Sequence, residues 1–326
     1  MTKGIKILKT GGAEVMNWTS VDLSESGPSQ GEIRIRHSAV GVNYIDTYHR
    51  SGIYPVQLPC ILGIEAVGTV TALGEGVEGL AVGNRVGYAS GPLGAYTEER
   101  DFSANKVVKI PELVDDVEAA AILLKGMTVE YLFNRTYKIK PGQFFLFHAA
   151  AGGVGLLACQ WARAIGAKMI GTVSTDEKAR HAKKLGCEFT INYSNEDVAK
   201  RVREITEGEG VSVVYDGVGK DTFQSSIDCL SDRGMFVSFG QSSGMIESVN
   251  LHESFAPKNL YYTRPSLLVY NKTKKELYES SALLFDLLKS KKIKAPNIKK
   301  YALKDARQAH IDLQSRKTVG SLVLVP

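Results

Sequence analysis

The N-terminal part of the chain alternates apolar and polar positions over short stretches that turn residues interrupt. GIKILKT at 4–10 and EIRIRHSAV at 32–40 show this alternation, and EAVGTVTALG, RVGY, AYTEER and KVVKI follow at close intervals. A period of two places every second side chain on one face of a β-strand, and the intervening glycines and prolines favour turns. Short, closely spaced strands predict an all-β sandwich or a partly open barrel.

A helical pattern replaces this alternation after Pro111. Residues 111–137 are rich in alanine and leucine and carry acidic residues near their start. Acidic residues in the first turn and good helix formers after it are typical of a helix. Because glycine weakens a helix interior, we expect two helical segments with a break at Gly126.

From Gly142 to Phe239 predicted strands alternate with predicted helices. The strands are 144–148, 168–173, a short segment around Phe189, 211–215 and 235–239, and the helices are 153–165, 176–185, 196–207 and 222–230. Such alternation predicts a parallel sheet with helices on both faces and right-handed crossovers. The tail is mixed, with helices expected at 274–289 and 304–316 and a last strand at 321–325.

The composition is that of a globular protein of roughly two domain lengths. Of the 326 residues, 44% are hydrophobic and 23% charged, which excludes a disordered, collagen-like or coiled-coil chain. The four cysteines, at positions 60, 159, 187 and 229, never form C-x-x-C, so they predict neither a disulfide framework nor a zinc site. No apolar run approaches the ~20 residues of a membrane span. We therefore expect a soluble, cytoplasmic protein without a membrane partner.

The net charge of +5 is unevenly spread. Residues 265–326 contain 13 Lys and Arg against 5 Asp and Glu, whereas residues 1–124 contain 10 against 15. The excess gathers in KSKKIKAPNIKK at 289–300, a stretch that is able to attract nucleic acid or another polyanion. We favour the simpler interpretation, a solvated helix end and loop, and do not expect a nucleic-acid partner.

A glycine cluster marks the first strand-to-helix turn of the alternating region. FFLFH at 144–148 leads into AAAGGVG, with glycines at 152, 153 and 155. Small residues let the backbone approach a pyrophosphate, and the N–H groups of a helix N-terminus favour an anion. Ala150 stands at the first glycine of G-x-G-x-x-G, so the match is imperfect. A glycine cluster alone is more often a tight turn, but the surrounding β/α alternation predicts dinucleotide binding here.

The end of the next strand discriminates between the two nicotinamide dinucleotides. An NAD site places Asp or Glu there to hold the ribose 2′-OH, and such a carboxylate repels a 2′-phosphate. This chain has Ser174 and Thr175 at that point and Lys178 one turn into the next helix. Asp176 follows, but we expect it to cap its own helix. The sequence therefore predicts NADPH as the cofactor.

Several motifs together resemble the medium-chain dehydrogenase/reductase superfamily, and within it the zinc-independent, zeta-crystallin-like NADPH:quinone oxidoreductases. They are GVNYIDTYHRSGIYP at 41–55, the glycine-spaced run from 62 to 86, LLKGMTVEYL at 123–132, HAAAGGVG at 148–155, VYDGVG at 214–219 and SRKTVGSLVLV at 315–325. They cover essentially the whole chain in the family's order. The resemblance implies a GroES-like β-barrel catalytic domain, residues 1–124 and 265–326, and a Rossmann dinucleotide-binding domain, residues 125–264.

The zinc-dependent branch of this superfamily differs from the chain at its metal ligands. Those relatives have a cysteine and a histidine where this chain has Asn43 and Ile64, and they carry a lobe of four closely spaced cysteines that is absent here. Since zinc requires sulfur or imidazole ligands, the resemblance implies a reaction without metal. Glu65 then has no metal role, and we expect a structural one within the glycine-rich corner of the barrel.

The resemblance also implies individual site residues around a cleft between the domains. Asn43 and Tyr48 would be catalytic, and Tyr54, Lys125 and Thr128 would bind the substrate. Cofactor contacts would fall on Gly152, Gly153, Val154 and Gly155 at the pyrophosphate, on Ser174, Lys178 and Tyr193 around the adenosine phosphate, and on Phe239, Arg264 and Arg316 along the rest. Phe239 also fits a core position and Tyr193 a strand end, while His148 fits a packed strand residue better than a catalyst.

The implied reaction is NADPH-dependent reduction of a quinone by a homodimer. Asn43 and Tyr48 would donate hydrogen bonds to the developing oxyanion, and solvent would supply the proton because the sequence contains no obvious general acid. Two alternatives stay open: an NADPH-dependent reductase of 2-alkenals and enones, and a nucleotide-liganded RNA-binding or structural protein of the zeta-crystallin type. RNA binding would fall steeply with salt and would survive loss of the cleft residues.

Lys178→Ala tests the NADPH prediction. The substitution should raise KM for NADPH by the equivalent of ~1–3 kcal/mol, the worth of a charge-assisted contact, and leave KM for NADH nearly unchanged. Steady-state kinetics with each cofactor measures both values. Equal losses with NADPH and NADH would show that Lys178 does not contact the 2′-phosphate.

Overall fold

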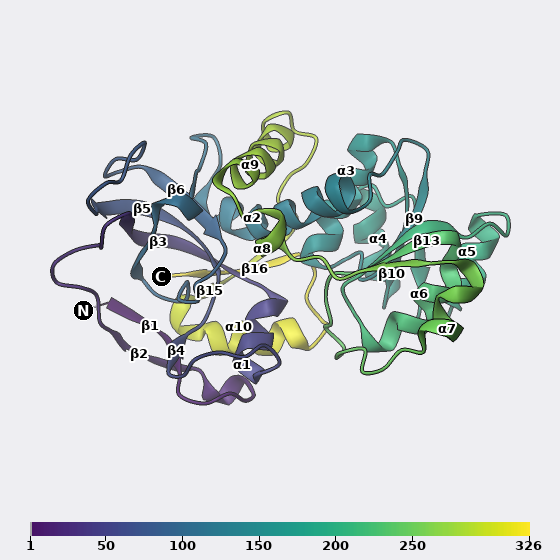
Figure 1. Ribbon diagram of the computed structural model, residues 1–326, viewed down its shortest axis with the longest axis horizontal. Helices are drawn as coiled ribbons and strands as arrows, with labels where there is room; N and C mark the ends of the chain where they lie inside the picture. Colours follow the sequence, from purple (N-terminus) through teal and green to yellow (C-terminus); the bar gives the residue numbers. More distant parts are fainter. Residues whose placement is uncertain (1) are drawn as a thin grey trace. The chain divides into compact units, whose positions relative to one another are not determined.

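The computed structural model describes residues 2–326 (Figure 1). The chain divides into two compact units. The first unit comprises Met1–Met127, Asn271–Lys289 and Ala295–Pro326, and the second comprises Thr128–Tyr270 and Ser290–Lys294. Within the described residues, no helix is long and apolar enough to cross a membrane.

The first unit is built on two β-sheets. Its elements are β1 (Thr2–Ile7), β2 (Asn17–Val21), β3 (Glu32–Val42), α1 (Tyr44–Ser51), β4 (Cys60–Ile61), β5 (Glu65–Leu73), β6 (Arg85–Ala89), β7 (Glu99–Ser103), β8 (Val108–Lys109), α9 (Lys274–Lys289), β15 (Ile298–Ala302), α10 (Ala306–Gln314) and β16 (Ser321–Val325). One sheet has the order β2-β1-β4, and the other has the order β15-β16-β3-β5-β6-β8 with β7 paired to β3. The predicted short strands are confirmed, and the last strand completes the larger sheet beside β3.

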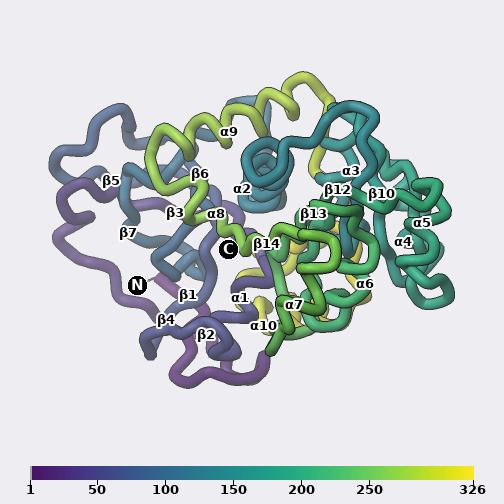
Figure 2. The backbone as a smooth tube through the Cα atoms, turned by 45° about the vertical axis from the view of Figure 1, so that its right-hand side comes forward, coloured from purple at the N-terminus to yellow at the C-terminus, as the bar shows by residue number. Residues whose placement is uncertain are grey.

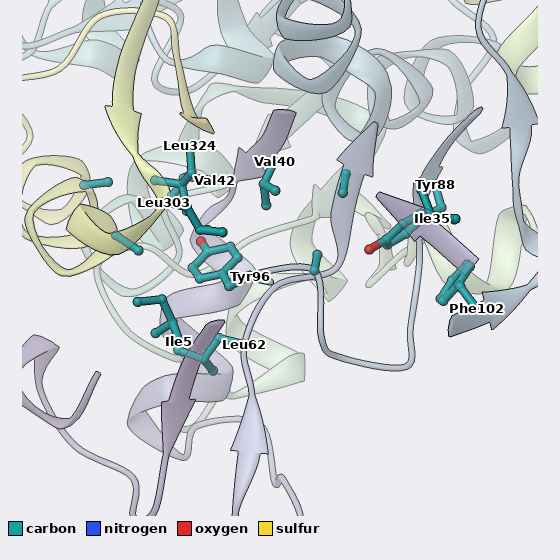
Figure 3. Packing of buried hydrophobic residues seen from close by; sticks show 14 of the residues in the cluster. Ile5, Ile35, Val40, Val42, Leu62, Tyr88, Tyr96, Phe102, Leu303 and Leu324 are labelled. Carbon is teal, nitrogen blue, oxygen red and sulfur yellow. The ribbon is translucent and has the colours of Figure 1, made fainter. Parts of the chain in front are cut away.

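Alternating apolar positions of these strands form the core of the first unit. Tyr96 lies among Ile5 and Leu62 on one side and Leu324 on the other, as Figure 3 shows. Tyr88 stacks on Phe102 with ring centroids 4.2 Å apart. Burying each such side chain stabilises the fold by about 1.5–3 kcal/mol. The strand pattern therefore fixes which face of each sheet is buried.

The helix that follows the strands corrects the predicted break at Gly126. Helix α2 runs without interruption over Asp116–Tyr131, and a π-helical turn, Leu132–Thr136, continues it. Figure 2 shows α2 beside α9, and a Cβ at Gly126 would lie only 2.7 Å from Leu284 Cδ2. Gly126 is thus a contact position where two helices pack closely. The cost of a glycine in the helix is offset by the burial of Leu284, which is fully buried.

The second unit contains a parallel sheet with helices between its strands. Its elements are β9 (Phe144–Phe147), α3 (Gly153–Ile165), β10 (Lys168–Val173), α4 (Asp176–Lys184), β11 (Phe189–Asn192), α5 (Val198–Ile205), β12 (Val211–Asp216), α6 (Phe223–Cys229), β13 (Leu230–Ser238), α7 (Leu251–Ser254), β14 (Tyr261–Thr263) and α8 (Leu267–Tyr270). The strand order is β11-β10-β9-β12-β13-β14, with every pairing parallel. Numbered from the first strand, this is 3-2-1-4-5-6, the order of a dinucleotide-binding sheet. The predicted β/α alternation is confirmed.

Several segments differ from the predicted boundaries; β13, for example, begins at Leu230, where the end of a helix was predicted. Helix α5 begins at Val198 because Asp197 caps it, accepting a hydrogen bond from the N–H of Lys200 at 2.8 Å. The end of the basic stretch is a strand, because Lys299 and Lys300 lie on β15, which pairs in parallel with β16. The prediction of a helix end and loop is therefore wrong for these last residues.

Candidate functional site

The glycine turn joins β9 to α3 at the carboxyl end of the parallel sheet. Gly152 is the N-cap of α3 in extended conformation, and Ala149 before it has a left-handed backbone with φ 56°. A Cβ at Gly155 would lie 2.7 Å from the Ala150 carbonyl carbon, so the helix packs on the turn only because this residue lacks a side chain. The strand order reverses between β9 and β12, which is where such sheets bind their ligands. The turn thus offers backbone N–H groups to a pyrophosphate.

Ser174, Lys178 and Tyr193 gather at the ends of β10 and β11. Lys178 Nζ donates to Ser174 Oγ at 3.1 Å, and the N–H of Tyr193 donates to the Val173 carbonyl at 3.1 Å. The Tyr193 side chain is 46% exposed, so it is available to a ligand rather than packed in the core. A hydroxyl, an ammonium and an aromatic ring on one rim fit an adenosine that carries a 2′-phosphate.

The expected role of Asp176 as a helix cap is wrong. Thr175 caps α4, since its hydroxyl accepts from the N–H of Lys178 at 3.2 Å. The Asp176 carboxylate instead accepts from Asn192 Nδ2 at 2.8 Å. Threonine at N-cap binds the same backbone donors that aspartate would. The hydrogen bond to Asn192 therefore engages the acidic group that follows the strand end.

Phe239 and Arg264 lie at the same carboxyl edge, beyond β13 and β14. The N–H of Phe239 donates to the Asp216 carbonyl at 2.8 Å, and its half-buried ring lies 5.5 Å from that of Phe147. Arg264 Nη1 donates to the Ser238 carbonyl at 2.7 Å. The Phe239 ring is therefore held against Phe147, and the Arg264 side chain is held by the carbonyl that ends β13, at the edge that carries the glycine turn.

His148 is a structural residue, as predicted. The buried ring contacts Thr172 Oγ1 and Ser226 Oγ, each at 3.0 Å, and burial lowers its pKa. Sequence reasoning missed its neighbour Asp216, a fully buried carboxylate on β12 that accepts from the N–H groups of Val218 and Gly219 at 2.7 and 3.0 Å. The segment VYDGVG contained the signal, because an aspartate that ends an apolar strand before glycines fits a turn.

In the first unit, Glu65 binds two of the predicted site residues at once. It starts β5 and is fully buried. Its Oε2 accepts from Asn43 Nδ2 at 2.7 Å and lies 3.5 Å from Lys125 Nζ, while its Oε1 accepts from the N–H of Leu124 at 2.7 Å. Glu65 therefore lies in the interior of the first unit, as expected. The carboxylate also explains why Asn43 and Lys125, which are buried, lie together.

A second buried carboxyl, Asp46, ends a chain of hydrogen bonds through α1 and α10. Its Oδ2 accepts from the Asn43 N–H at 2.8 Å and from Tyr96 Oη at 2.9 Å. Burial raises the pKa of Asp46 to about 7, with Glu65 adding to the increase against these hydrogen bonds and Lys125. Asp46 is therefore only partly ionised at neutral pH.

His310 sets the direction of that chain. Its Nδ1 lies 3.1 Å from Arg50 Nη1, and its Nε2 lies 2.9 Å from Tyr96 Oη. Arginine only donates, so Nδ1 must accept. Burial lowers the pKa of His310 to about 3, so the neutral ring carries its proton on Nε2 and donates to Tyr96. Tyr96 then has its own hydrogen free for Asp46.

Tyr48 and Tyr54 form an aromatic pair at the end of α1. Their ring centroids are 5.4 Å apart, and the N–H of Tyr54 donates to the Tyr48 carbonyl at 3.1 Å. Tyr48 is buried and Tyr54 half-buried.

Arg316 belongs to this unit as well and follows α10 with a left-handed backbone, φ 60°. Thr128 is assigned to the second unit and is buried in α2.

The described residues contain no group of three or more His, Cys, Asp or Glu side chains arranged to hold a metal ion. The four cysteines are free thiols, three of them buried.

Comparison with known proteins places the chain among oxidoreductases. A family model described as alcohol dehydrogenase GroES-like domain matches residues 29–112, and one described as zinc-binding dehydrogenase matches residues 153–284. The chain is 50% identical to the quinone oxidoreductase of Salmonella typhimurium over 100% of both chains. It is 45% identical to a 2-haloacrylate reductase from Burkholderia, over 100% of this chain and 99% of that protein.

A solved structure gives the same result in three dimensions. The crystal structure of Escherichia coli quinone oxidoreductase complexed with NADPH matches with a TM-score of 0.97 and 49% identity, over 99% of this chain and 100% of that one. The fold class predicted from the sequence, a GroES-like domain with a Rossmann nucleotide-binding domain, is confirmed.

Asp46→Asn tests the proton on Asp46. A folded-state pKa raised from 3.8 to about 7 contributes stability at low pH that is lost as the pH rises toward 7. The free energy of unfolding of the native protein, minus that of the variant, should therefore fall by about 1 kcal/mol per pH unit between pH 5 and 7 and level off above. Urea denaturation at stepped pH measures this difference. The exposed Asp232→Asn is the control, and a pH-independent difference for Asp46→Asn would contradict the raised pKa.

Proposed function

Because the chain belongs to the zinc-independent quinone oxidoreductase family of the medium-chain dehydrogenase/reductase superfamily, we propose that it reduces quinones with NADPH and without a metal ion. The observation that carries the proposal is similarity over the full length, both to a curated quinone oxidoreductase and to one solved with NADPH. NADPH supplies the reducing equivalents when bound.

The residues of the second unit fit this cofactor. Gly155 lets α3 pack directly on the turn, because a Cβ there would clash with the Ala150 backbone, and Gly152, Gly153 and Val154 at the start of α3 would bind the pyrophosphate. Ser174 and Lys178 would bind the 2′-phosphate, with Tyr193 beside the adenosine. Phe239 and Arg264 would bind farther along the dinucleotide, and Arg316 would contribute from the first unit. An ammonium and a hydroxyl at the rim would favour NADPH over NADH, because both groups bind the 2′-phosphate that NADH lacks.

The first unit supplies the groups proposed to act on the acceptor. Asn43 and Tyr48 would donate hydrogen bonds to the quinone oxygen as negative charge develops on it, which lowers the barrier in a site that excludes water. Lys125 and Thr128 would bind the acceptor, and Tyr54 would form the wall behind it. The buried position of Asn43, Tyr48 and Lys125 supports this role, because polar groups shielded from water interact strongly with a developing charge.

We further propose a catalytic domain of residues 1–124 and 265–326, a dinucleotide-binding domain of residues 125–264, and a location in the cytoplasm. Four free cysteines support a reducing compartment. Nucleic acid is not proposed as a partner, because part of the basic stretch is neutralised within the chain. Lys299 Nζ lies 2.6 Å from Asp312, and Lys289 Nζ lies 3.8 Å from Asp286.

A homodimer is proposed through the edge of the parallel sheet. Strand β14 has a partner on one side only, and Tyr261 and Tyr262 on it are 59% and 54% exposed. Val269 on α8, shortly after β14 in sequence, is 69% exposed. An exposed apolar edge strand favours pairing with another strand, and the same edge of a second copy is self-complementary about a two-fold axis.

A second candidate substrate class is the activated alkene. The 45% identity to a 2-haloacrylate reductase favours this class, since haloacrylates, like enones, are alkenes conjugated to a carbonyl group. The two classes share the fold and differ in what the acceptor pocket admits.

One assay separates these functions. The purified protein should oxidise NADPH with ortho- and para-quinones, and NADH much more slowly, because only NADPH engages Ser174 and Lys178. Absorbance at the reduced nicotinamide band follows both rates. Rapid reduction of 2-alkenals or 2-haloacrylate without quinone turnover would reassign the substrate. No oxidation with any acceptor would contradict an enzymatic function.

Light scattering after size exclusion tests the dimer. The native protein should elute with twice the 35.5 kDa chain mass, and Tyr261→Lys should shift it to the monomer because two like charges would meet at the edge. Leu113→Lys, at an exposed position of the first unit, is the control. A monomeric native protein, or a dimer unaffected by Tyr261→Lys, would contradict the interface.

A further inference from the structure

Glu65 is a buried carboxylate placed against two residues of the proposed acceptor site. It is fully buried and touches Asn43, Leu124 and Lys125 from the start of β5. A buried ionised carboxylate is retained only where donors surround it. Leu124 is bound through its backbone, so this contact holds α2 in place, while the other two contacts reach the side chains of Asn43, which also caps α1, and of Lys125.

We propose that Glu65 is a positioning residue for the reduction, which orients the amide of Asn43 and the ammonium of Lys125 toward the acceptor. This inference rests on the proposed function, which places Asn43 and Lys125 at the acceptor. Glu65 itself is assigned no contact with the acceptor or the cofactor and acts on the reaction only through those two residues.

The chemistry of the contact fixes the orientation of Asn43. A carboxylate only accepts hydrogen bonds, so the group that Asn43 presents to Glu65 at 2.7 Å must be its NH2. One N–H of the Asn43 amide is therefore bonded to Glu65. Because the amide group is planar, this bond also fixes the directions of the second N–H and of the carbonyl oxygen. The helix-capping position of Asn43, whose N–H binds Asp46, fixes the backbone from which the side chain extends. Asn43 is therefore held at both ends.

Lys125 is held differently. Its Nζ lies 3.5 Å from Glu65 Oε2 and has no hydrogen-bond partner among the described residues, although its side chain is only 7% exposed. An ammonium carries three donors, and a buried one left without acceptors is costly. The ion pair with Glu65 keeps the charge in place, and the donors remain for an acceptor oxygen that the protein does not supply.

The backbone around Glu65 is shaped to admit this carboxylate. A Cβ at Gly41 on β3 would overlap Glu65 Oε2 and would lie 2.6 Å from the Ala120 carbonyl oxygen. No side chain fits at Gly41 while Glu65 keeps its position. The end of β3, the start of β5 and helix α2 thus meet at one carboxylate, which sets the spacing between Asn43 and Lys125.

An amide–carboxylate exchange separates positioning from simple support of the fold. In Glu65→Gln, the new carbonyl can still accept from the Leu124 N–H, but the new NH2 faces that of Asn43. In Asn43→Asp, two carboxylates face each other. The double variant Asn43→Asp/Glu65→Gln restores one hydrogen bond with its direction reversed, so its thermal midpoint should return toward the native value.

The expected kinetics, measured with the acceptor that the native enzyme reduces fastest, differ from the stability. Glu65→Gln should lower kcat about tenfold or more, because the acceptor-facing donors lose their orientation, and leave KM for NADPH unchanged. The double variant should regain its thermal midpoint but not its kcat, since a carboxylate then replaces the donor at position 43. Glu112→Gln, an exposed carboxylate of the first unit, should match the native enzyme in both.

Two results would overturn the inference. Full kcat in Glu65→Gln would show that orientation by the carboxylate is not needed, and recovery of kcat together with the thermal midpoint in the double variant would show that Glu65 only supports the fold. Either result with an active native enzyme leaves the proposed function intact. A native enzyme that turns over no acceptor would overturn both proposals.

Discussion

The interior of the first unit depends on a carboxylate that has no access to water. Glu65 is fully buried, and its two oxygens bind the side-chain amide of Asn43 and, from another part of the chain, the backbone N–H of Leu124 and the ammonium of Lys125. Removing a charge from water is unfavourable unless donors replace the lost solvent, and breaking one such contact leaves the charge uncompensated. The positions of Asn43 and Lys125 are consequences of this requirement.

A second buried carboxyl, Asp46, lies nearby. Burial is the main reason that its pKa is raised to about 7, and the charge of Glu65 adds to the increase. Its Oδ2 then needs donors, which Tyr96 and the backbone of Asn43 provide. Tyr96 in turn needs a donor on its other side, and the neutral His310 provides it. Along this chain each group donates to the next, from Arg50 to His310, then to Tyr96 and finally to Asp46.

In the second unit, the carboxyl ends of the parallel strands determine where the candidate cofactor site lies. The N–H groups at the start of α3 and the rim formed by Ser174, Lys178 and Tyr193 lie at the carboxyl edge of one sheet, which is where sheets with this strand order bind their ligands. This site could be predicted from sequence because its signals are local: glycines at a turn, a missing acid at a strand end, a lysine one turn later. The element order of this unit was predictable for the same reason.

What the sequence did not predict depends on contacts between distant segments. The glycine at 126 looks like a helix break until Leu284 is packed against it. Thr175 and Asp176 are both good caps, and only the position of Asn192 decides between them. The link from Glu65 to Asn43 spans 22 residues and that from Arg50 to His310 spans 260, so neither leaves a periodic pattern in the chain. Buried polar contacts of this kind follow from the tertiary fold.

Hydrogen-bond donors held by the protein, not a metal ion, are proposed to serve the acceptor during NADPH-dependent reduction. Quinone reduction should be measured before and after exhaustive dialysis against a chelator, with the zinc content per chain determined on the same samples. We expect an unchanged kcat when zinc is far below one ion per chain. Activity that falls in proportion to the zinc removed, and returns when zinc is added back, would contradict it.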